Sequence, residues 1–308
     1  MVGVAIVGGT GAGVWRQVIS AGEVVLSAGA IESARLLLAS ASDAEPDGLS
    51  NGTDQVGRHL QAHLYAGASA LFNSDVVDLV GPGPAIATCD FRHGVDGIVG
   101  GGMLANEFVP TPGLTRRYLT EVGFIPPHGL DAVRGLREQS ARMVRVMGPF
   151  HEVTSADSRV RLDPSVVDGH GNAVAALSGA LHAEDLRGQT FLAERAAEWL
   201  TASGAAQVRQ MALGSLSSGP SAGQHQAGTC RMGTDPATSV TDPYGRVWGH
   251  DNLRVVDAST HVTNGGVNPV LTVLANALRV AEHMTTGTTM SGRGGRSTRS
   301  GARAVPVD

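Results

Sequence analysis

The sequence predicts an α/β frame that holds an inserted α+β domain built on an antiparallel sheet. Three observations support this fold class. A strand pattern, a small-residue turn and a helical pattern follow one another in residues 23–40, and the same texture returns in residues 252–284. Between them, residues 61–224 carry alternating apolar segments, clusters of turn residues and one long helical pattern. Strands that alternate with helices are typical of α/β proteins, whereas the middle stretch is typical of α+β domains.

Length and composition indicate a globular protein and exclude several classes. The chain has 308 residues, of which 42% are hydrophobic and 17% charged, and this length suffices for about two domains. The net charge is −5 and no basic stripe with interleaved aromatic residues occurs, so we expect no nucleic acid as a partner. Two cysteines exclude a disulfide framework and a cysteine-rich zinc site. Because no apolar run approaches about 20 residues and no signal-peptide pattern is visible, we expect no membrane span and a cytoplasmic location.

A glycine cluster lies between two apolar segments near the N-terminus. Val2–Val7 is predicted as a strand, GGTGAG occupies Gly8–Gly13, and Val14–Ile19 is predicted as a second strand. A dinucleotide-binding loop needs the spacing G-x-G-x-x-G, but valine stands where the third glycine belongs. A helix here would also have only about two turns. We therefore predict a β-hairpin with a glycine-rich turn, and an NAD-dependent Rossmann dehydrogenase is the weaker interpretation.

The next elements are a strand and a helix joined by small residues. Glu23–Ser27 is a short apolar run, as in a strand buried on both faces. It leads into Ala28-Gly29-Ala30, and Ile31–Ser40 has helical spacing. This order is the half-unit of a doubly wound sheet, and its turn is a place where a nucleotide can approach the backbone.

The middle stretch is predicted to combine strands with one long helix. Leu64–Phe72 and Arg159–Leu162 alternate between apolar and other residues, as strands of an antiparallel sheet do. The helix has an apolar face and ends at Gly204. That face is formed by Leu192, Ala196, Trp199 and Leu200.

The last 60 residues before the tail return to the α/β pattern of a strand followed by a helix. We predict a buried strand at Asn252–Asp257, a small-residue loop at Ala258–Val267, and a helix from Pro269 to Met284. Residues 285–308 consist mainly of Gly, Ser, Thr and Arg and are predicted to be a disordered tail. The helix has one apolar face, formed by Leu271, Leu274, Ala275, Leu278 and Ala281.

Three segments, taken in their order and spacing, resemble the glucose-methanol-choline (GMC) oxidoreductases. The first is EVVLSAGAIESARLLLAS from Glu23, followed by NGTDQVGRHLQAH from Asn51. The second is HQAGTCRMG from His225. The third is NLRVVDAS from Asn252, followed by NGGVNPVLTVLANA from Asn264. The resemblance extends to about residue 284, and the NGGVNP form is most similar to the branch of pyranose oxidases and glycoside 3-oxidases or dehydrogenases.

The resemblance implies a domain division and an activity. Residues 1–60 would form part of a three-layer FAD-binding domain, residues 61–224 the substrate-binding domain, and residues 225–284 the return to the FAD-binding domain with the catalytic pair. The family uses FAD to oxidise CH–OH groups. The expected partners are therefore a small alcohol, sugar or glycoside and an electron acceptor, either oxygen or another molecule.

The resemblance also assigns roles to single residues. His225 corresponds to the base that removes the hydroxyl proton while hydride leaves the carbon for flavin N5, and a neutral imidazole suits this task. Asn268 corresponds to the group that hydrogen-bonds the substrate oxygen, and the helix after it would point its N-terminus at the flavin. His261 is a secondary candidate for lining the substrate site. The residues expected to contact FAD are Ala28, Gly29, Asp257, Ala258, Asn268 and Pro269, with ordinary turn chemistry as the equal alternative for Asp257.

The same residue types also have plainer interpretations. A histidine beside Gly-Thr-Cys is more often a hydrogen-bonded structural residue, and Asn268 before proline is by default a helix N-cap. His225 and Cys230 lack the third ligand that a metal site needs, so we expect no metal, and we interpret Cys230 as a small buried side chain. His59 and His63 share a face if their segment is helical, and we interpret them as surface or domain-boundary packing.

The chain departs from the family pattern on its N-terminal side. The family starts with a strand, a G-x-G-x-x-G loop and a helix that bind the ADP half of FAD, and the 308 residues contain no counterpart. The chain is therefore expected to be the C-terminal part of such an enzyme. The rival hypothesis is a non-catalytic remnant, or one subunit that needs an N-terminal partner chain to bind FAD. A lyase that uses this fold with an idle flavin is a further alternative.

Overall fold

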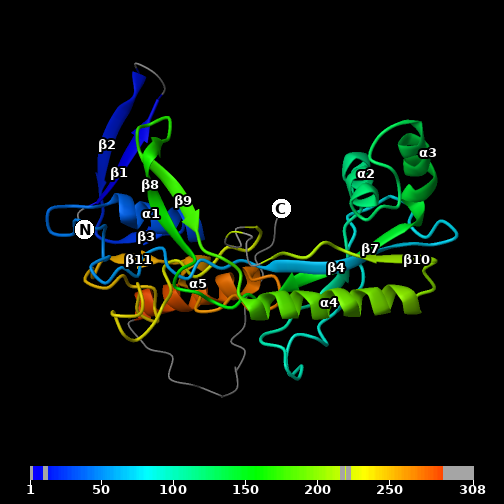
Figure 1. Cartoon of the computed structure of the whole chain (residues 1–308). Helices are drawn as coiled ribbons and strands as arrows, with labels where there is room; N and C mark the ends of the chain where they lie inside the picture. Colours follow the sequence, from blue (N-terminus) through cyan, green and yellow to red (C-terminus); the bar gives the residue numbers. More distant parts are fainter. Residues whose placement is uncertain (1–2, 10–12, 216–218, 220–222, 287–308) are drawn as a thin grey trace, which may run out of the picture.

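The computed structural model describes residues 3–9, 13–215, 219 and 223–286. In Figure 1 the first 40 residues, drawn in blue, lie at one end of the molecule. Residues 112–139, which form two short helices, lie at the opposite end. The predicted tail of residues 285–308 falls outside the described residues except for its first two positions, which are helical.

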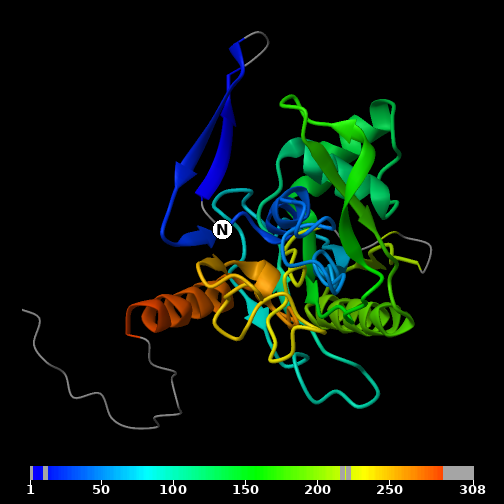
Figure 2. The same cartoon turned by 90° about the vertical axis from the view of Figure 1, so that its left-hand side faces the viewer.

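The N-terminal glycine cluster joins the two strands of a β-hairpin. β1 (Gly3–Gly8) and β2 (Trp15–Ser20) pair antiparallel, with Gly3 opposite Ser20 and Gly8 opposite Trp15. Figure 2 shows that this hairpin projects away from the rest of the molecule. Because a paired strand stands where a dinucleotide-binding unit needs a helix, the predicted hairpin is confirmed and the Rossmann interpretation of this cluster is wrong.

A small parallel sheet carries the predicted strand–turn–helix unit. β3 (Val24–Leu26) pairs in parallel with β11 (Leu253–Val255), so the carboxyl ends of both strands meet at one edge. α1 (Ala30–Ala39) follows β3 directly after the small-residue turn. Among the named strands of the described residues, β3 and β11 form the one parallel pair. Only this part of a three-layer α/β arrangement is therefore described. The apolar core here comprises Ala34, Leu37, Val56, Leu60, Val160, Cys230, Val240, Val247, Leu253 and Val255.

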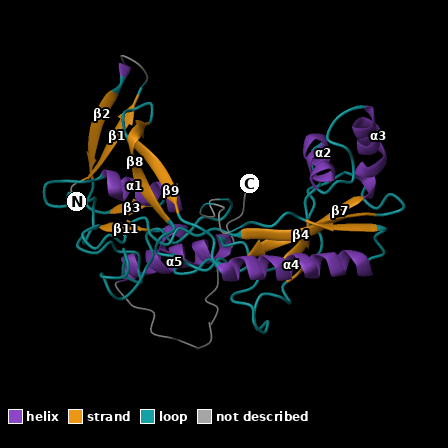
Figure 3. Cartoon of the chain, viewed as in Figure 1, coloured by secondary structure: helices purple, strands orange, loops and turns teal. Residues whose placement is uncertain are grey.

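A second hairpin packs on α1. β8 (Arg159–Val167) and β9 (Ala173–Ser178) form their own two-stranded sheet, and Arg35 of α1 donates to the Ala173 carbonyl at 2.7 Å. Figure 3 shows both strands beside α1 and away from the sheet of the middle stretch. The sequence predicts the start of β8 as a strand of that middle sheet, and the structure differs. Alternation identifies a strand, but it does not specify which sheet the strand joins.

The middle stretch contains a five-stranded sheet in the order β10-β4-β7-β6-β5, with every neighbouring pair antiparallel. Its long central strands pair over eight residues, from Leu64 opposite Phe150 to Leu71 opposite Met143. The strands are β4 (Leu64–Leu71), β5 (Ala87–Thr88), β6 (Leu104–Asn106), β7 (Met143–Phe150) and β10 (Gln207–Gln210).

The long helix predicted from the sequence covers this sheet. α4 (Ala183–Ala202) begins with a capping box between His182 and Asp185, and Gly204 follows it with φ +86°. A Cβ added at Gly188 would lie 1.9 Å from the ring of Phe150, so glycine at this helix position allows the sheet to approach. The shared core comprises Ala66, Ala68, Ala70, Leu104, Val146, Phe150, Leu192, Ala193, Ala196 and Leu200.

Two short helices pack against the end of the sheet that lies away from the N-terminal hairpin. α2 (Pro112–Glu121) starts at Thr111, whose side chain accepts a hydrogen bond from the Leu114 N–H, and α3 (Leu130–Gln139) follows. A small core of Leu71, Leu119, Ile125 and Met143 joins them to the sheet.

The C-terminal helix shows its apolar face to solvent. α5 (Val270–Thr286) begins directly after Pro269, as predicted to within one residue. Leu271 is 81% exposed and Leu278 is 72% exposed, so this face packs on nothing within the described part of the chain. None of the described helices is both long and apolar enough to cross a membrane.

Candidate active site

Three loops meet between the parallel pair β3–β11 and the five-stranded sheet, and together they form the candidate site. These loops carry Gln61, Ala227 and Asn264. Gln61 and Ala227 form a two-residue antiparallel bridge: Ala227 N–H donates to the Gln61 carbonyl at 2.8 Å, and Gln61 N–H donates back at 3.2 Å. The side-chain oxygen of Gln61 accepts from the Asn264 N–H at 3.0 Å. Gln61 therefore joins all three loops at one buried position.

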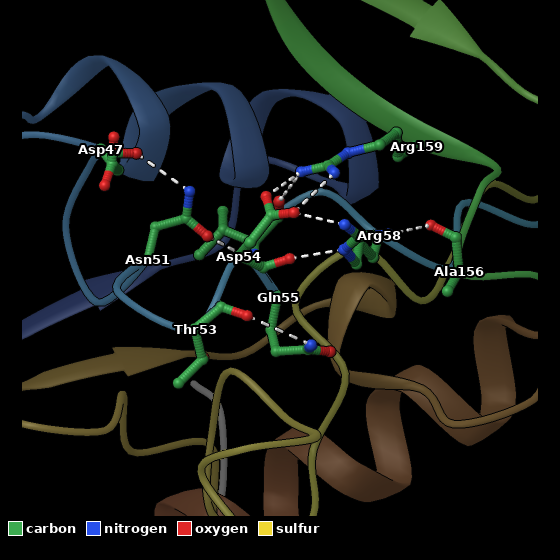
Figure 4. A network of polar contacts seen from close by, with 9 residues as sticks. Asp47, Asn51, Thr53, Asp54, Gln55, Arg58, Ala156 and Arg159 are labelled. Atoms are coloured by element: carbon green, nitrogen blue, oxygen red, sulfur yellow. Dashed lines mark hydrogen bonds and ion pairs between the residues drawn. The ribbon is translucent and has the colours of Figure 1, made fainter.

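A charged network holds the first of these loops against β8. Arg159 donates to both carboxylate oxygens of Asp54, at 2.6 and 3.1 Å, and its side chain is only 5% exposed (Figure 4). Arg58 binds the same carboxylate and also donates to the Ala156 carbonyl at 3.0 Å. The two guanidinium groups hold the pKa of Asp54 well below its usual range. The loop that leads into the site is thus held by bidentate ion pairing.

His225 adopts a backbone conformation that non-glycine residues rarely take. Its φ is +69°, in the left-handed region. Its carbonyl accepts from the Asn264 side-chain amide at 2.5 Å, which helps to hold this conformation. Such strained residues concentrate at functional sites, where the surrounding contacts maintain them.

The structure brings the two predicted catalytic residues together. The side-chain nitrogen of Asn268 lies 3.3 Å from Nε2 of His225. His225 is half-buried and Asn268 is exposed, just before α5. Partial burial lowers the pKa of His225 below its ordinary value of 6.5, which favours the neutral imidazole. The catalytic role of the pair stays a prediction.

His63 also belongs to this site, and the sequence analysis missed it. Segment 51–63 consists of turns and bridges instead of a helix, so the shared helix face of His59 and His63 is not present. His63 is 3% exposed, its Nδ1 lies 2.8 Å from Nδ1 of His225, and its Nε2 lies 2.8 Å from the Gly265 carbonyl. The interpretation of His63 as packing is therefore incomplete: His63 ends the segment NGTDQVGRHLQAH, but nothing in that segment indicates its contact with His225.

Tyr65 contacts the same imidazole. Its hydroxyl donates to the Gln224 side-chain oxygen at 2.9 Å and lies 3.4 Å from Nδ1 of His225. His225 thus has His63 and Tyr65 on its Nδ1 side and Asn268 on its Nε2 side.

A cavity of about 500 Å³ opens beside these residues. His63, Tyr65 and Asn268 line it together with strands β4, β6 and β7 of the five-stranded sheet. Most of its other lining is apolar, but Glu107 brings a carboxylate, which pairs with Arg145 at 3.2 Å. Burial raises the pKa of Glu107. The partners of the candidate base therefore line a space large enough for a small organic molecule, whereas His225 itself is not among the described residues that line it.

Asp257 connects the turn after β3 to the end of β11 through hydrogen bonds. Its Oδ2 accepts from the Gly29 N–H at 2.9 Å and from the Ser33 hydroxyl at 2.5 Å, and its Oδ1 accepts from the Ser259 N–H at 2.8 Å. The adjacent Ala258 carbonyl accepts from the Gly228 N–H at 3.2 Å, and this bond connects the Asp257 hydrogen bonds to the His225 loop. Hydrogen bonds within the two turns thus occupy the Asp257 carboxylate, and the contact of Asp257 with FAD stays a prediction.

Two other predicted residues are buried away from the cavity. His261 is 4% exposed and is not among the described residues that line the cavity, so its contact with substrate also stays a prediction. Cys230 is fully buried in the core, as predicted, and burial raises its pKa to about 12. Within the described residues, no group of three or more His, Cys, Asp or Glu side chains is arranged to hold a metal ion.

Comparison with known proteins supplies the family. Residues 154–277 match the family model described as GMC oxidoreductase, in its C-terminal form. Residues 154–277 are therefore assigned to the C-terminal domain of the GMC oxidoreductases. The curated relatives that it matches are named as oxidases and dehydrogenases. The narrower resemblance to pyranose and glycoside oxidases stays a prediction.

Two curated relatives match most of the chain. It is 32% identical over 276 residues to 2-methyl-1,2-propanediol dehydrogenase of Mycolicibacterium austroafricanum, a match that covers 87% of this chain and 49% of the relative. It is 30% identical to 6'''-hydroxyparomomycin C oxidase of Streptomyces lividus, over 84% of this chain and 45% of the relative. The chain therefore spans about half the length of the curated relatives it matches.

A solved structure shares the fold. Pyridoxine 4-oxidase from Mesorbium loti superposes with a TM-score of 0.55 over 90% of this chain and 53% of the solved chain, at 18% sequence identity. The fold of a GMC oxidoreductase is thus present in the described residues.

The residues around the Gly29 turn fit one part of a flavin cofactor. Gly29 has φ +86°, and a Cβ built on it would meet no heavy atom within 4 Å, so open space lies in front of the α1 N-terminus. Helix N-termini favour electron-rich groups because they expose unpaired N–H donors. A second helix, α5, begins beside Asn268. Two helix starts, one of them with open space before it, suit the polar edge of a flavin ring.

Proposed function

We propose that this protein is an FAD-dependent oxidoreductase that acts on the CH–OH group of an alcohol, sugar or glycoside. The observation that carries the proposal is the His225–Asn268 pair, with 3.3 Å between Nε2 and Nδ2, beside a cavity of about 500 Å³. Membership in a family of alcohol- and sugar-type oxidoreductases supports the general reaction.

The chemistry of the pair suits the oxidation of a hydroxyl group. A substrate hydroxyl that displaces the direct contact between the two side chains can give its proton to Nε2 of His225. The Asn268 amide can donate to the same oxygen and hold it in line while negative charge develops on it. A bound flavin would supply the hydride acceptor. The half-buried position of His225 keeps its imidazole neutral and therefore able to act as a base.

The proposed cofactor contacts lie at the carboxyl ends of β3 and β11. Ala28 and Gly29 would approach the flavin through their backbone, with Asp257 and Ala258 beside them. Asn268 and Pro269 would contact it at the start of α5. These roles are supported by the open space at Gly29 and by the position of both helix starts.

The cavity suits an uncharged substrate with hydroxyl groups. Its lining is largely apolar, and its carboxylate, Glu107, is already paired with Arg145 and accepts from the Tyr118 hydroxyl at 3.1 Å. The names of the relatives, 2-methyl-1,2-propanediol dehydrogenase and 6'''-hydroxyparomomycin C oxidase, agree with a hydroxyl-bearing molecule. The electron acceptor is oxygen or another small molecule.

Flavin retention followed by reduction tests the proposal. The purified chain is incubated with FAD and desalted, and its visible spectrum is recorded. Anaerobic addition of 2-methyl-1,2-propanediol and of a methyl glycoside then follows. We expect a retained flavin spectrum that bleaches with at least one alcohol. A folded chain, judged by circular dichroism, that retains no flavin would overturn the proposal for this chain alone.

A second proposal is that this chain supplies the catalytic pair to a two-part flavoenzyme, with another polypeptide segment covering α5. The exposed apolar face of α5 favours it, since Leu271 and Leu278 pack on nothing within the described residues. Flavin binding that appears only when a second segment is added would support this proposal over the first.

A further inference from the structure

A row of hydrogen bonds runs through two imidazoles. It starts at the Gly265 carbonyl, 2.8 Å from Nε2 of His63, and continues from Nδ1 of His63 to Nδ1 of His225 over 2.8 Å. It ends where Nε2 of His225 meets the Asn268 amide nitrogen at 3.3 Å. Each link needs one donor and one acceptor, so the chemistry of the two ends fixes the protons between them.

The carbonyl end fixes the proton of His63. A carbonyl oxygen only accepts, so Nε2 of His63 must carry the hydrogen. A neutral imidazole carries one N–H, which leaves Nδ1 of His63 as an acceptor.

His63 stays neutral because nothing around it favours a positive charge strongly enough. Its side chain is buried, and burial lowers its pKa to about 4. The titratable groups that face it are His225 and, farther away, His151, and both oppose a positive charge on it. No carboxylate contacts it among the described residues.

The contact with the Asn268 amide determines, by the same reasoning, which nitrogen of His225 carries the proton. The amide nitrogen of Asn268 only donates, so Nε2 of His225 must be the acceptor. Tyr65 agrees, because its hydroxyl donates to Gln224 and can accept from His225 at 3.4 Å. Both ends and the tyrosine therefore place the hydrogen of His225 on Nδ1.

We propose that His63 is a positioning residue that fixes His225 in the Nδ1–H tautomer, so that the bare Nε2 faces Asn268 and the substrate. An imidazole with protonated Nε2 could not accept a hydroxyl proton there. The functional meaning of this tautomer rests on the proposed function of His225 as the base. The tautomer itself is a property of the chain without flavin.

Nitrogen NMR of the histidine rings tests the inference directly. Long-range ¹H–¹⁵N correlation spectra of the ¹⁵N-histidine-labelled full chain at pH 7.5 distinguish protonated from bare ring nitrogens. We expect protonated Nε2 and bare Nδ1 for His63, and protonated Nδ1 and bare Nε2 for His225. Signals are assigned by their loss in His63→Asn and His225→Asn. Protonated Nε2 on His225 in the unaltered chain would overturn the inference.

Two substitutions separate positioning from packing. His63→Leu removes the acceptor, so we expect His225 to lose its fixed Nδ1–H form. His63→Asn places an amide oxygen close to the former Nδ1 position, so we expect the Nδ1–H form to be retained. His59→Asn is the control, because His59 is a half-buried histidine of the same loop and its Nδ1 has no hydrogen-bond partner among the described residues. A His63→Leu spectrum in which His225 keeps Nδ1–H would contradict the inference.

Flavin experiments distinguish failure of the inference from failure of the proposed function. If the protein retains FAD, His63→Leu should slow flavin reduction by about 10- to 100-fold with little change in substrate KM, the range found for partners that orient functional histidines. His63→Asn should recover most of that loss. A correct tautomer in a chain that binds no flavin would uphold the inference and overturn the proposed function for the chain alone.

Discussion

The position of one proton decides whether His225 can act as a base. Its Nδ1 faces His63 and its Nε2 faces Asn268, so the two nitrogens have different surroundings. The left-handed backbone at His225 directs the ring to this place, and the Asn264 amide holds that backbone. A substitution at any of these positions is therefore expected to alter base strength or orientation.

The pH dependence of flavin reduction should reflect the lowered pKa of His225. A base must be deprotonated, so the rate falls on the acid side of its pKa. Because partial burial shifts this pKa below 6.5, the acid limb should lie below pH 6.5. Stopped-flow reduction of the bound flavin between pH 4.5 and 8 measures it. An acid limb above pH 6.5 would contradict the burial of the imidazole.

From the sequence, site roles could be predicted only for residues that a motif marks, and those roles stay predictions. The resemblance identifies His225 and Asn268, and the structure places them in contact. His63 ends the NGTDQVGRHLQAH segment, but the resemblance assigns it no role, and 162 positions separate it from His225. Their contact depends on the Gln61–Ala227 bridge between distant loops, which no local pattern encodes.

At the scale of elements, α4 stabilises the sheet that lines the cavity. Leu192 is fully buried between α4 and the sheet, whereas Leu271 on α5 is 81% exposed. We expect Leu192→Ala to lower the free energy of unfolding by about 2–5 kcal/mol. The matched control Leu271→Ala should change it by less than about 0.5 kcal/mol. Urea unfolding measures both. Equal losses would indicate that the face of α5 is covered.

Elements were predicted well from periodicity, and their partners were not. The strands and helices at residues 3–39 and 183–202 lie where the spacing predicts them. The hairpin β8–β9 packs on α1 instead of the middle sheet, because a strand pattern carries no information about its neighbour. The apolar stripe of α5 predicts a buried face, yet that face is exposed among the described residues.

At the scale of the whole molecule, buried neutral histidines should make the protein sensitive to acid. Burial lowers the pKa values of His59 and His63 to about 4, below the unfolded value of 6.5. Between pH 6.5 and 4 the unfolded chain therefore binds more protons, and stability falls as the pH falls. Urea unfolding from pH 7 to 4.5 should show this loss, with a shallower slope in His63→Asn. An unchanged slope in that variant would contradict the buried, neutral state of His63.

The arrangement of the molecule explains why the site lies between its two ends. The parallel pair β3–β11 brings the Gly29 turn and Asp257 to one edge, and the five-stranded sheet supplies the cavity wall. The loops that carry His63, His225 and Asn268 run between these two parts. The proposed cofactor contacts and the proposed substrate contacts therefore lie on separate elements, as the family resemblance implies.

In the proposed reaction, His225 removes the substrate proton. The most direct measurement compares flavin reduction in the unaltered protein, in His225→Ala and in the control His59→Asn, each loaded with FAD and mixed anaerobically with the same alcohol. We predict equal flavin retention in all three, reduction slower by about 10²–10⁴-fold in His225→Ala, and a near-normal rate in the control. Reduction of His225→Ala at the rate of the unaltered protein would contradict the claim.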